Sequence, residues 1–510
     1  MQVPDEAVKS SSRLMVKLFP SRIASALEGL ENAVQMPYGC FEQASSTTYP
    51  NVLIYDYLKR AGKLTPAFEQ RAKRYISLGY QRLLRYEVSG GGFEWFGRAP
   101  ANQVLTAYGL MEFRDMSRVF PVDEQVIQRT QRWLIARQTG DGSWSPDGHS
   151  LSDGLWRSGY SGQQMVTAYI AWSLAESGYR GPALDRALAY LSRNLSIIDD
   201  PYTLALVTAT FAKAKHASLG AAATALAAKA TRRDKEAFFS PAAATVYYGR
   251  GVSGNIETTA LGVYALGLAA REAALVQGGL GYIASNRDYR GTWHSTQGTI
   301  LALRALLAGT AADADQQVSV RINGQDAGSF ALKASSETPQ LVDLGPRARQ
   351  GANVVELRGQ AAVPFQVVAS YVLPWREKGA EDDRPLTLKV EYGRTKVDLG
   401  GIVPLDVSLT YRKPEASGMA LLALGLPPGL TALAEDLEAL KSAGQVARYE
   451  LEAGRVNLYI DRLATGSTLS LKLRLKARGK VKTQGASSLA YLYYHPEVRA
   501  SAAPTPIVVN

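Results

Sequence analysis

A small-residue helical phrase recurs along the first two-thirds of the 510-residue chain. It reads LTAYGLMEF from Leu105, VTAYIAWSL from Val166, YTLALVTATF from Tyr202, TALGVYALGL from Thr259 and TILALRALL from Thr299. The threonines of successive phrases are 36 to 61 residues apart, which leaves room for one helical hairpin per unit. Repeats of this size bury the face of each unit against its neighbours. The pattern predicts five or six hairpins that close into an α/α toroid over residues 21–309.

Glycine-aromatic segments punctuate the same region and indicate the turns between helices. They read GGGFEWF at 90–96, GDGSW at 140–144 and GTWHSTQ at 291–297. Glycine permits the tight, positive-φ bends that such turns need. We expect the aromatic side chain to anchor each turn on the helix that follows.

The residues after 309 change from a helical to an alternating pattern. Apolar and polar residues alternate within the segments 318–324, 328–334, 339–345, 353–359 and 365–375. Turns with Gly, Asn and Asp separate these segments. This period of two is typical of antiparallel strands. The early stretch SSRLMVKLF at 11–19 has the same character, so we expect it to pair with them. The toroid would then be inserted in a small β-sandwich made of 1–20 and 310–378.

A second β-domain is predicted at the end of the chain. The charged stretch REKGAEDDRP at 376–385 is typical of a linker. Beyond it, LTLKVEYG, VPLDVSLTYR, RVNLYIDRL and LSLKLRLKAR again alternate, with one short helix candidate at 432–444. Residues 386–510 are therefore predicted to form a second β-sandwich.

Composition excludes several classes of function. The formal net charge is +11, but Lys and Arg are spread along the chain rather than clustered, so we expect no nucleic-acid partner. A single cysteine rules out an internal disulfide and a cysteine-based zinc site. The four histidines (His149, His216, His294 and His495) are far apart, so we expect no metal and no cofactor.

The same survey bears on membranes and targeting. No run of 18 apolar residues occurs, so no membrane span is expected. The N-terminal residues MQVPDEAVKSSSRL contain no apolar segment, so no signal peptide is expected either.

The lone cysteine, Cys40, stands three residues before Gln43 in MPYGCFEQASSTTYP. This spacing places both side chains on one face of a helix. Because a helix N-terminus favours a thiolate, we expect a lowered pKa for Cys40. A thiolate held against a carboxamide can displace ammonia and form an internal thioester, which must be shielded from water. The alternative is a small buried cysteine with no chemistry.

The stretch PYGCFEQASSTTYPN resembles the thioester motif Gly-Cys-x-Glu-Gln of the alpha-2-macroglobulin and complement superfamily. Gly39, Cys40, Glu42 and Gln43 match, whereas Phe41 stands where many members have Gly or Leu. The resemblance extends to GGGFEWFG, TWHSTQGTILALRAL and the C-terminal run from GLPPGL to LAYLYYHP, and it is strongest to bacterial alpha-2-macroglobulins. It implies a thioester domain (21–309) inserted in a CUB-like β-sandwich (1–20 and 310–378), followed by a receptor-binding-type macroglobulin β-sandwich (386–510).

The resemblance also implies a function. The chain is similar to the C-terminal, thioester-bearing part of a protease trap, in which bait cleavage exposes the thioester and the captured protease is acylated. The implied partners are target proteases, attacked through a Lys amine or a hydroxyl, and the N-terminal macroglobulin and bait domains that this chain lacks. Such a trap is used once and is not a turnover enzyme. Its implied location is the periplasm, anchored to a membrane through an N-terminal segment absent here.

In relatives, aromatic and Met side chains of the receptor-binding domain cover the thioester. Matching positions here are Met419, Tyr459, Tyr493 and Tyr494, with Tyr38 contributing from the thioester side. Each could instead be ordinary sandwich packing. In a strand, Tyr491 and Tyr493 share one face and Tyr494 takes the other, so they cannot all line a lid. Met419 and Tyr493 are the favoured shield residues because both types pack well around sulfur.

Two further residues are candidates by the same resemblance. Glu42 is either an acid that complements the helix start or a supporting residue of the site. His149 lies where complement relatives carry a histidine that takes over the acyl group. A neutral imidazole is a competent nucleophile, but an exposed loop histidine is the favoured interpretation.

Two other functions stay open. QTGDGSW at 138–144 is similar to turns of terpene cyclases, which also use α/α barrels, but the paired acids Asp199 and Asp200 form no catalytic cluster and Cys40 would stay unexplained. An opsonin or adhesin could use the same thioester to tag surfaces. It would differ from a trap only in its target.

Overall fold

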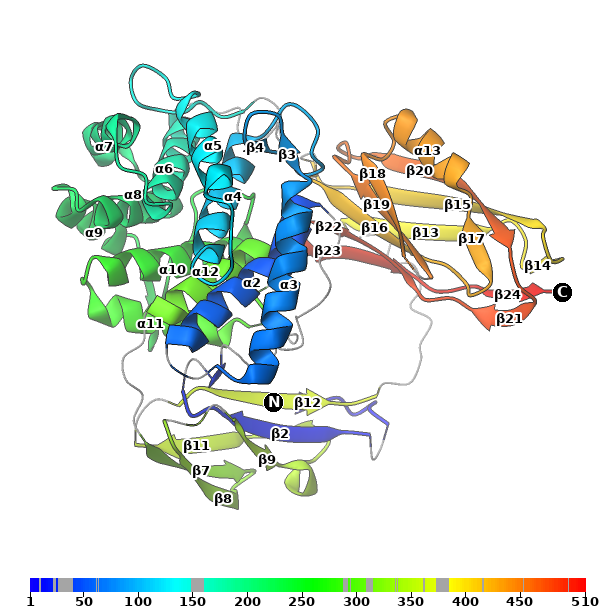
Figure 1. Cartoon of the computed structure of the whole chain (residues 1–510). Helices are drawn as coiled ribbons and strands as arrows, with labels where there is room; N and C mark the ends of the chain where they lie inside the picture. The colour runs from blue at the N-terminus through cyan, green and yellow to red at the C-terminus, as the bar shows by residue number, and fades with distance from the viewer. Residues whose placement is uncertain are drawn as a thin grey trace.

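The computed structural model describes most of the chain. The described residues are 1–8, 11–21, 24–25, 40–60, 62, 64–147, 160–287, 292–293, 295–308, 315–334, 336, 338–360, 363–372, 385–414, 417–452, 454–493 and 495–510. Figure 1 shows a helical domain with one β-sandwich below it and a second at its right. Within these residues, no helix is both long and apolar enough to cross a membrane.

Helices of the first domain form a closed inner ring, in which each packs on the next and the last packs on the first. In the described part of the chain its members are α2 (Phe41–Arg60), α4 (Gln103–Met116), α6 (Tyr160–Glu176), α8 (Pro201–Ala214), α10 (Gly251–Leu268) and α12 (Thr296–Ala308). The recurring phrases of the sequence are α4, α6, α8, α10 and α12. Neighbours cover most of the surface of these helices, so even polar residues such as Glu112 and Glu257 are buried. The predicted toroid is confirmed.

An outer layer of helices surrounds the ring (Figure 1). Its described members are α3 (Pro66–Leu84), α5 (Glu124–Ile135), α7 (Pro182–Asn194), α9 (Leu219–Ala227) and α11 (Ala273–Ser285). Each buries a single stripe. In α3 the buried positions are Ala72, Ile76, Gly79 and Leu83, at steps of three and four residues. Short hairpins complete the connections, namely β3–β4 (Glu87–Val88, Gly92–Phe93) and β5–β6 (Thr231–Arg233, Glu236–Phe238).

The threonines of the repeated phrases have a structural role. In four units the buried hydroxyl oxygen accepts the backbone N–H of the aromatic residue that ends the preceding turn. The pairs are Thr106 with Phe93, Thr167 with Trp144, Thr259 with Phe239 and Thr299 with Trp293. Two of the tryptophans also donate their indole N–H to an outer helix, Trp144 to Leu134 O at 2.8 Å and Trp293 to Ile283 O at 2.7 Å. The cyclase-like turn QTGDGSW is thus explained by packing.

Replacing Thr167 with valine tests this role of the threonines. The variant keeps the side-chain shape but leaves the buried Trp144 N–H, now 2.9 Å from the hydroxyl, without its acceptor. We expect a loss of about 1–3 kcal/mol in unfolding free energy, measured by denaturant titration. Thr224→Val on the exposed face of α9 is the matched control and should change stability by less than about 0.5 kcal/mol. Equal effects of the two variants would contradict the assignment.

A buried network of charged and polar groups draws on all six inner helices. Glu176 accepts hydrogen bonds from Tyr264 O–H at 2.6 Å and Trp172 Nε1–H at 3.0 Å, and pairs with Lys213 at 3.0 Å. Asp115 accepts from Tyr49 O–H at 2.7 Å and pairs with Arg304. Because Arg304 lies in α12 and Tyr49 in α2, this half of the network closes the ring.

The toroid is inserted in a β-sandwich of two three-stranded sheets. One sheet has the order β11–β7–β8 and the other β12–β2–β9, both antiparallel. The strands are β2 (Arg13–Leu18), β7 (Gln316–Ile322), β8 (Gln325–Leu332), β9 (Gln340–Asp343), β11 (Val355–Gly359) and β12 (Phe365–Ser370), with a minor pair β1 (Gln2–Val3) and β10 (Gly351–Ala352). Since β2 precedes the helices and its partners follow them, the expected insertion is confirmed.

The last part of the chain is a second β-sandwich. Its sheets have the orders β13–β15–β20–β17 and β18–β19–β16–β22–β23, with β14–β24–β21 at one end. The strands are β13 (Leu386–Tyr392), β14 (Lys396–Val397), β15 (Ile402–Tyr411), β16 (Ala420–Gly425), β17 (Leu430–Ala432), β18 (Arg448–Glu452), β19 (Arg455–Ile460), β20 (Thr468–Ala477), β21 (Val481–Gln484), β22 (Ser488–Leu492), β23 (His495–Ala502) and β24 (Pro506–Val509). The helix expected at 432–444 is α13 (Ala434–Ser442).

Strand β16 lies between two cores. Ala420, Leu422 and Leu424 face the sandwich interior, whereas Leu421 belongs to the buried cluster of the toroid. The whole strand is buried, which is why it reads ALLALG without alternation. The five-stranded sheet therefore packs one of its faces against the helical domain.

Candidate reactive site between the toroid and the C-terminal sandwich

Cys40 is the N-cap of α2. Its carbonyl accepts the first helical hydrogen bond from Ala44 N–H at 2.9 Å. Gln43 is the N3 residue, and its Oε1 accepts the backbone N–H of Cys40 at 3.0 Å. This is the reciprocal arrangement of a capping box, with a thiol in place of the usual hydroxyl. Helix-start geometry therefore helps to hold the carboxamide beside the cysteine.

The expected lowering of the Cys40 pKa is wrong for this arrangement. Burial raises the pKa of the thiol to about 12, and the charge of Glu42 adds to the rise. The backbone N–H groups of Gln43 and Glu42 act in the predicted direction and lower it, but the loss of solvent outweighs them. The sequence revealed the helix N-terminus but not the full burial of the sulfur.

The packing around Phe41 explains why a large side chain is tolerated at this position, where many sequences with the motif have Gly or Leu. Its ring is buried between Phe93, at 5.3 Å between centroids, and Tyr86, at 6.2 Å. Gly109 of α4 makes room for it, since a Cβ there would come within 2.8 Å of the ring. The larger residue at 41 is thus accommodated by glycine in the facing helix, away from the reacting atoms.

The turn after β4 covers the start of α2. Trp95 O accepts Phe41 N–H at 2.8 Å, and the indole N–H of Trp95 donates to Glu42 at 3.4 Å. Glu42 is buried among these groups rather than exposed at the helix start. Its side chain therefore fixes the turn against the motif.

The C-terminal sandwich reaches the same atoms. Tyr459 of β19 donates its hydroxyl to Gln43 Oε1 at 2.7 Å and lies 3.1 Å from Glu450 Oε2. Its ring packs edge-on against Phe96 at 5.8 Å. Glu450 is held by Arg448 at 2.9 Å and, from α3, by Arg82 at 3.6 Å. A polar contact thus joins residues that are 416 positions apart in the chain.

Apolar side chains of the same sheet complete the cover. Met419, Leu421 and Tyr459 are buried in the cluster that contains Cys40, and Tyr491 and Tyr493 are half-buried against it. Tyr493 N–H donates to Met419 O at 2.8 Å, which ties the two ends of the cover together. Cys40 is fully buried, and the C-terminal sandwich contributes to its surroundings through Tyr459, which contacts the neighbouring Gln43.

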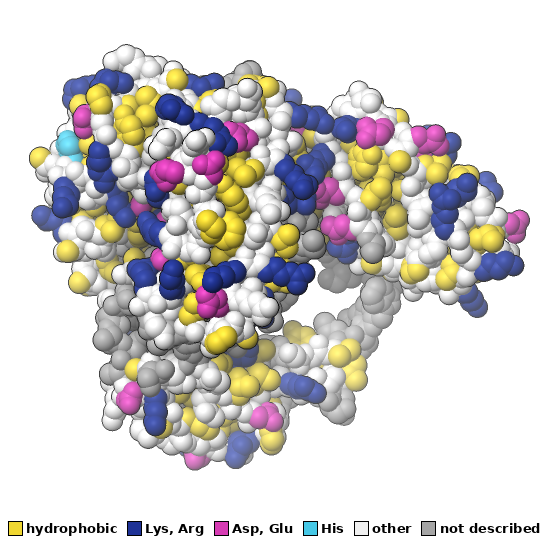
Figure 2. All heavy atoms as spheres, viewed as in Figure 1, with side chains coloured by type: hydrophobic (Ala, Val, Ile, Leu, Met, Phe, Trp, Pro, Cys, Tyr) yellow, Lys and Arg dark blue, Asp and Glu magenta, His cyan; other side chains and the backbone are white. Residues whose placement is uncertain are grey.

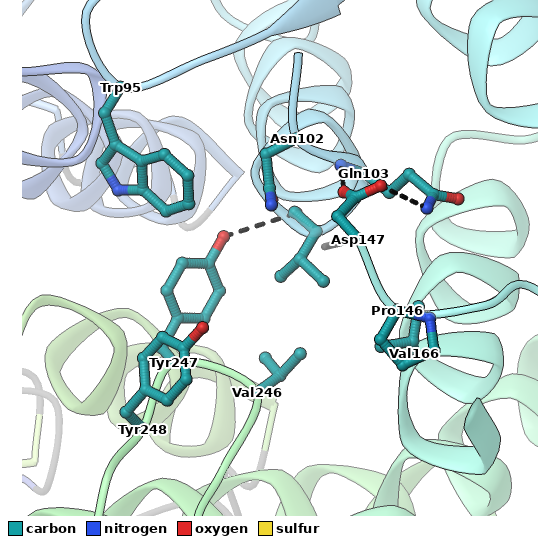
Figure 3. Close-up of a pocket in the computed structure, with 10 residues that line it drawn as sticks. Trp95, Asn102, Gln103, Pro146, Asp147, Val166, Val246, Tyr247 and Tyr248 are labelled. Carbon is teal, nitrogen blue, oxygen red and sulfur yellow. Dashed lines mark hydrogen bonds between the residues drawn. The ribbon is translucent and has the colours of Figure 1, made fainter. Parts of the chain in front are cut away.

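A pocket opens beside this region at the mouth of the toroid (Figure 3). It is lined by Trp95, Asn102, Gln103, Val104, Pro146, Asp147, Val166, Val246, Tyr247 and Tyr248. Asp147 accepts from Gln103 N–H at 2.5 Å and from Gln103 Nε2–H at 2.6 Å, so it binds the first residue of α4, whose N-cap is Asn102. Trp95 stands both in this wall and against Glu42. Over the described ranges, no group of three or more His, Cys, Asp or Glu side chains could hold a metal ion.

Comparisons with known proteins identify the architecture. A family model described as the A-macroglobulin TED domain matches residues 13–308, more than half of the chain. The chain belongs to the A-macroglobulin family. A second model, the A-macroglobulin receptor binding domain, matches residues 415–504. The TED domain is the toroid and the receptor-binding domain is the C-terminal sandwich, whereas the boundaries set from the sequence stay predictions.

Solved bacterial structures share the fold over the whole chain. Salmonella alpha-2-macroglobulin reacted with methylamine aligns with a TM-score of 0.71 and 17% identity, covering 100% of this chain and 32% of that one. The native conformation of E. coli alpha-2-macroglobulin aligns with a TM-score of 0.72 and 16% identity, covering 100% of this chain and 32% of that one. Native E. coli alpha-2-macroglobulin from domain MG7 to the C-terminus aligns with a TM-score of 0.67 and 17% identity, covering 100% of this chain and 80% of that one. The present chain thus spans about a third of the length of the first two.

The structure describes some of the residues predicted for the site and leaves others outside the described ranges. Cys40, Glu42 and Gln43 lie together, and Tyr459 of the receptor-binding domain contacts Gln43, whereas Met419 and Tyr493 are placed only in or against the extended apolar core that includes Cys40. Tyr38, His149 and Tyr494 lie outside the described residues. The roles predicted for all of them stay predictions.

Sequence reasoning missed several residues of the site. The sequence pattern assigns Trp95 and Phe96 only to the turn GGGFEWF. A turn does not require two adjacent bulky aromatic residues, so this pair could have indicated a further contact. The unbroken apolar run of β16 could have revealed that Leu421 is buried. No feature of the sequence reveals Glu450, because its contact with Arg82 depends on how two domains dock.

Proposed function

We propose that this chain is the thioester-bearing C-terminal part of a bacterial alpha-2-macroglobulin-type protease trap. In the proposal, Cys40 Sγ and Gln43 Cδ are joined in an internal thioester that acylates a captured protease after bait cleavage. The observation that carries it is the capping box: Gln43 Oε1 accepts the N–H of the fully buried Cys40 at 3.0 Å. Family membership supports the same function.

The chemistry requires only the two side chains and an attacking amine. A Lys amine adds to Cδ, the C–S bond breaks, and an isopeptide bond and the Cys40 thiol remain. Nothing regenerates the thioester after capture, so the protein acts once and is not a turnover enzyme. The acceptor is a Lys amine or a hydroxyl of the protease.

Enclosure also suppresses reactivity through the leaving group. Burial raises the pKa of the Cys40 thiol to about 12, so a buried thiolate is a poor leaving group. Movement of the receptor-binding domain would return the sulfur to water, where the pKa of a thiol is about 8.5. Exposure would therefore admit the nucleophile and improve the leaving group together.

Truncating the cover tests the proposed shield. Met419→Ala combined with Tyr493→Ala opens a path for water to Cys40, so we expect spontaneous thioester hydrolysis to accelerate about tenfold or more, a barrier change of about 1.4 kcal/mol. The rate is followed as thiol release at neutral pH. Leu422→Ala is the control, since it removes a buried apolar group from the sandwich-facing side of β16 and should leave hydrolysis within about twofold. Unchanged hydrolysis and methylamine reactivity in the double variant would remove the shielding claim.

The partners and location belong to the same proposal. The chain would act together with N-terminal macroglobulin and bait domains, in keeping with its coverage of 32% of the aligned full-length structures. Its place would be the periplasm, with a membrane anchor supplied by a segment outside this sequence. On the face of the molecule shown in Figure 2, Lys and Arg side chains are dispersed among Asp and Glu side chains.

Thiol titration tests the proposed function. The native chain should show no titratable thiol before methylamine treatment and one afterwards, because Cys40 is the only cysteine. Methylamine should be found on Gln43 by peptide mapping. A full equivalent of thiol in the freshly purified protein, with Gln43 still a carboxamide, would contradict the proposal.

A further inference from the structure

Two hydrogen-bond donors converge on one atom of the proposed thioester, Gln43 Oε1. Cys40 N–H lies at 3.0 Å and Tyr459 O–H at 2.7 Å. A backbone N–H can only donate, so the oxygen of the carboxamide, and not its nitrogen, must face this point. Donors 2.7–3.1 Å from the position that an oxyanion will occupy stabilise the intermediate of acyl transfer. Here both donors already contact the oxygen that takes the charge, and both need to stay within that range as Cδ becomes tetrahedral.

Such donors are needed where the thioester is made. A carboxamide is a poor acyl donor, and attack by a thiol places negative charge on Oε1 before ammonia leaves. We propose that Tyr459 is a catalytic residue for closure of the Cys40–Gln43 thioester, acting with the Cys40 N–H as an oxyanion hole. The inference rests on the proposed function and adds to it how the reactive bond forms.

The closure step balances without any co-reactant. Cys40 Sγ adds to Gln43 Cδ, and the C=O pair of electrons moves onto Oε1, where the two donors hold it. The thiol proton passes to Gln43 Nε2. The Cδ–N bond then breaks, ammonia leaves with that proton, and the carbonyl re-forms as a thioester.

Glu450 makes the hydrogen bond of Tyr459 selective for the charged intermediate. The hydroxyl has one proton and two acceptors, Gln43 Oε1 at 2.7 Å and Glu450 Oε2 at 3.1 Å. Before attack, Glu450 competes for it, although Arg448 and Arg82 at its other oxygen weaken the competition. When Oε1 becomes negative, the proton is drawn fully to it. An interaction that strengthens in the transition state accelerates the step.

The second donor comes from a different domain, which gives closure a conformational requirement. Tyr459 belongs to β19 of the receptor-binding domain, and its ring is placed by Phe96 of the TED domain. The complete hole exists only while the two domains are docked. The thioester therefore forms in the docked state, in which Cys40 is fully buried, and undocking removes the donor that Tyr459 supplies.

Re-closure kinetics of the whole chain test the proposal. Ammonia cleaves the thioester back to the Cys40 thiol and the Gln43 carboxamide, and re-closure after its removal is followed by loss of titratable thiol and of about 17 Da. Tyr459→Phe keeps the ring against Phe96 but lacks the donor, so closure should slow by about 10²-fold or more. Tyr449→Phe removes a hydroxyl of the neighbouring strand β18 that donates to Glu438 of α13, and this variant should close at the wild-type rate.

Two further measurements distinguish a catalytic role of Tyr459 from a role in shielding alone. The rate of Cys40 alkylation in the cleaved state reports docking and should match between wild type and Tyr459→Phe. Hydrolysed chains carry Glu at position 43 and weigh about 1 Da more than the carboxamide form, so loss of thioester is counted apart from failure to form it. A Tyr459→Phe variant that closes within about twofold of wild type overturns the inference and leaves the proposed function standing. A wild-type chain that never forms the bond removes both.

Discussion

Replacing Cys40 with serine is expected to abolish amine incorporation and covalent capture completely while leaving the fold intact. Serine is among the best N-cap residues, so the helix start of α2 and its bond to Gln43 should survive within about 1 kcal/mol. The variant lacks the sulfur that makes the acyl group reactive. Labelling with methylamine, followed by mapping of Gln43, measures the loss.

The control for this variant is its own stability. Thermal unfolding of Cys40→Ser should follow that of the wild type, which separates lost chemistry from lost structure. Methylamine on Gln43 in the serine variant would show that the carboxamide reacts by another route. That result would contradict a thioester.

Replacing Arg304 with methionine is expected to cost the largest amount of stability, about 3–5 kcal/mol of unfolding free energy. Burial lowers the pKa of Arg304, but Asp115, Tyr49 and Glu176 outweigh it and raise the pKa above its ordinary value. The guanidinium is therefore charged inside the toroid, and its removal leaves the buried Asp115 carboxylate with only the half-exposed Arg118 as an ion-pair partner. Denaturant unfolding of the toroid measures the effect.

Arg118 supplies a matched comparison because it pairs with the same carboxylate at 3.2 Å. Its side chain is 48% exposed, against 8% for Arg304, so Arg118→Met should cost less than about 1 kcal/mol. Adding Asp115→Asn to Arg304→Met should recover part of the loss, since the buried charge is then gone. Similar losses for the two arginines would show that burial does not set the cost.

Local patterns predicted much of the fold. The five phrases beginning near Leu105, Val166, Tyr202, Thr259 and Thr299 are inner helices of the ring. Alternation revealed the two sandwiches and even the early strand β2. These features depend on neighbours in sequence, which a period of 3.6 or 2 records directly.

The site was predictable only where it is local. The capping box of Cys40 and Gln43 lies within four residues, so the sequence contains it. The bond from Tyr459 spans 416 positions and follows from docking of two rigid domains, for which no periodicity exists. The prediction of a lowered Cys40 pKa was wrong for the same reason, because elements remote in sequence supply the burial that raises the pKa.

Intact mass spectrometry of the freshly purified chain tests the central claim most directly. A closed Cys40–Gln43 thioester lowers the mass by about 17 Da relative to the sequence, since one ammonia is lost. Methylamine should then add about 31 Da and release one thiol. A chain at the full sequence mass, with a carboxamide at Gln43 and a reactive Cys40, would contradict the account.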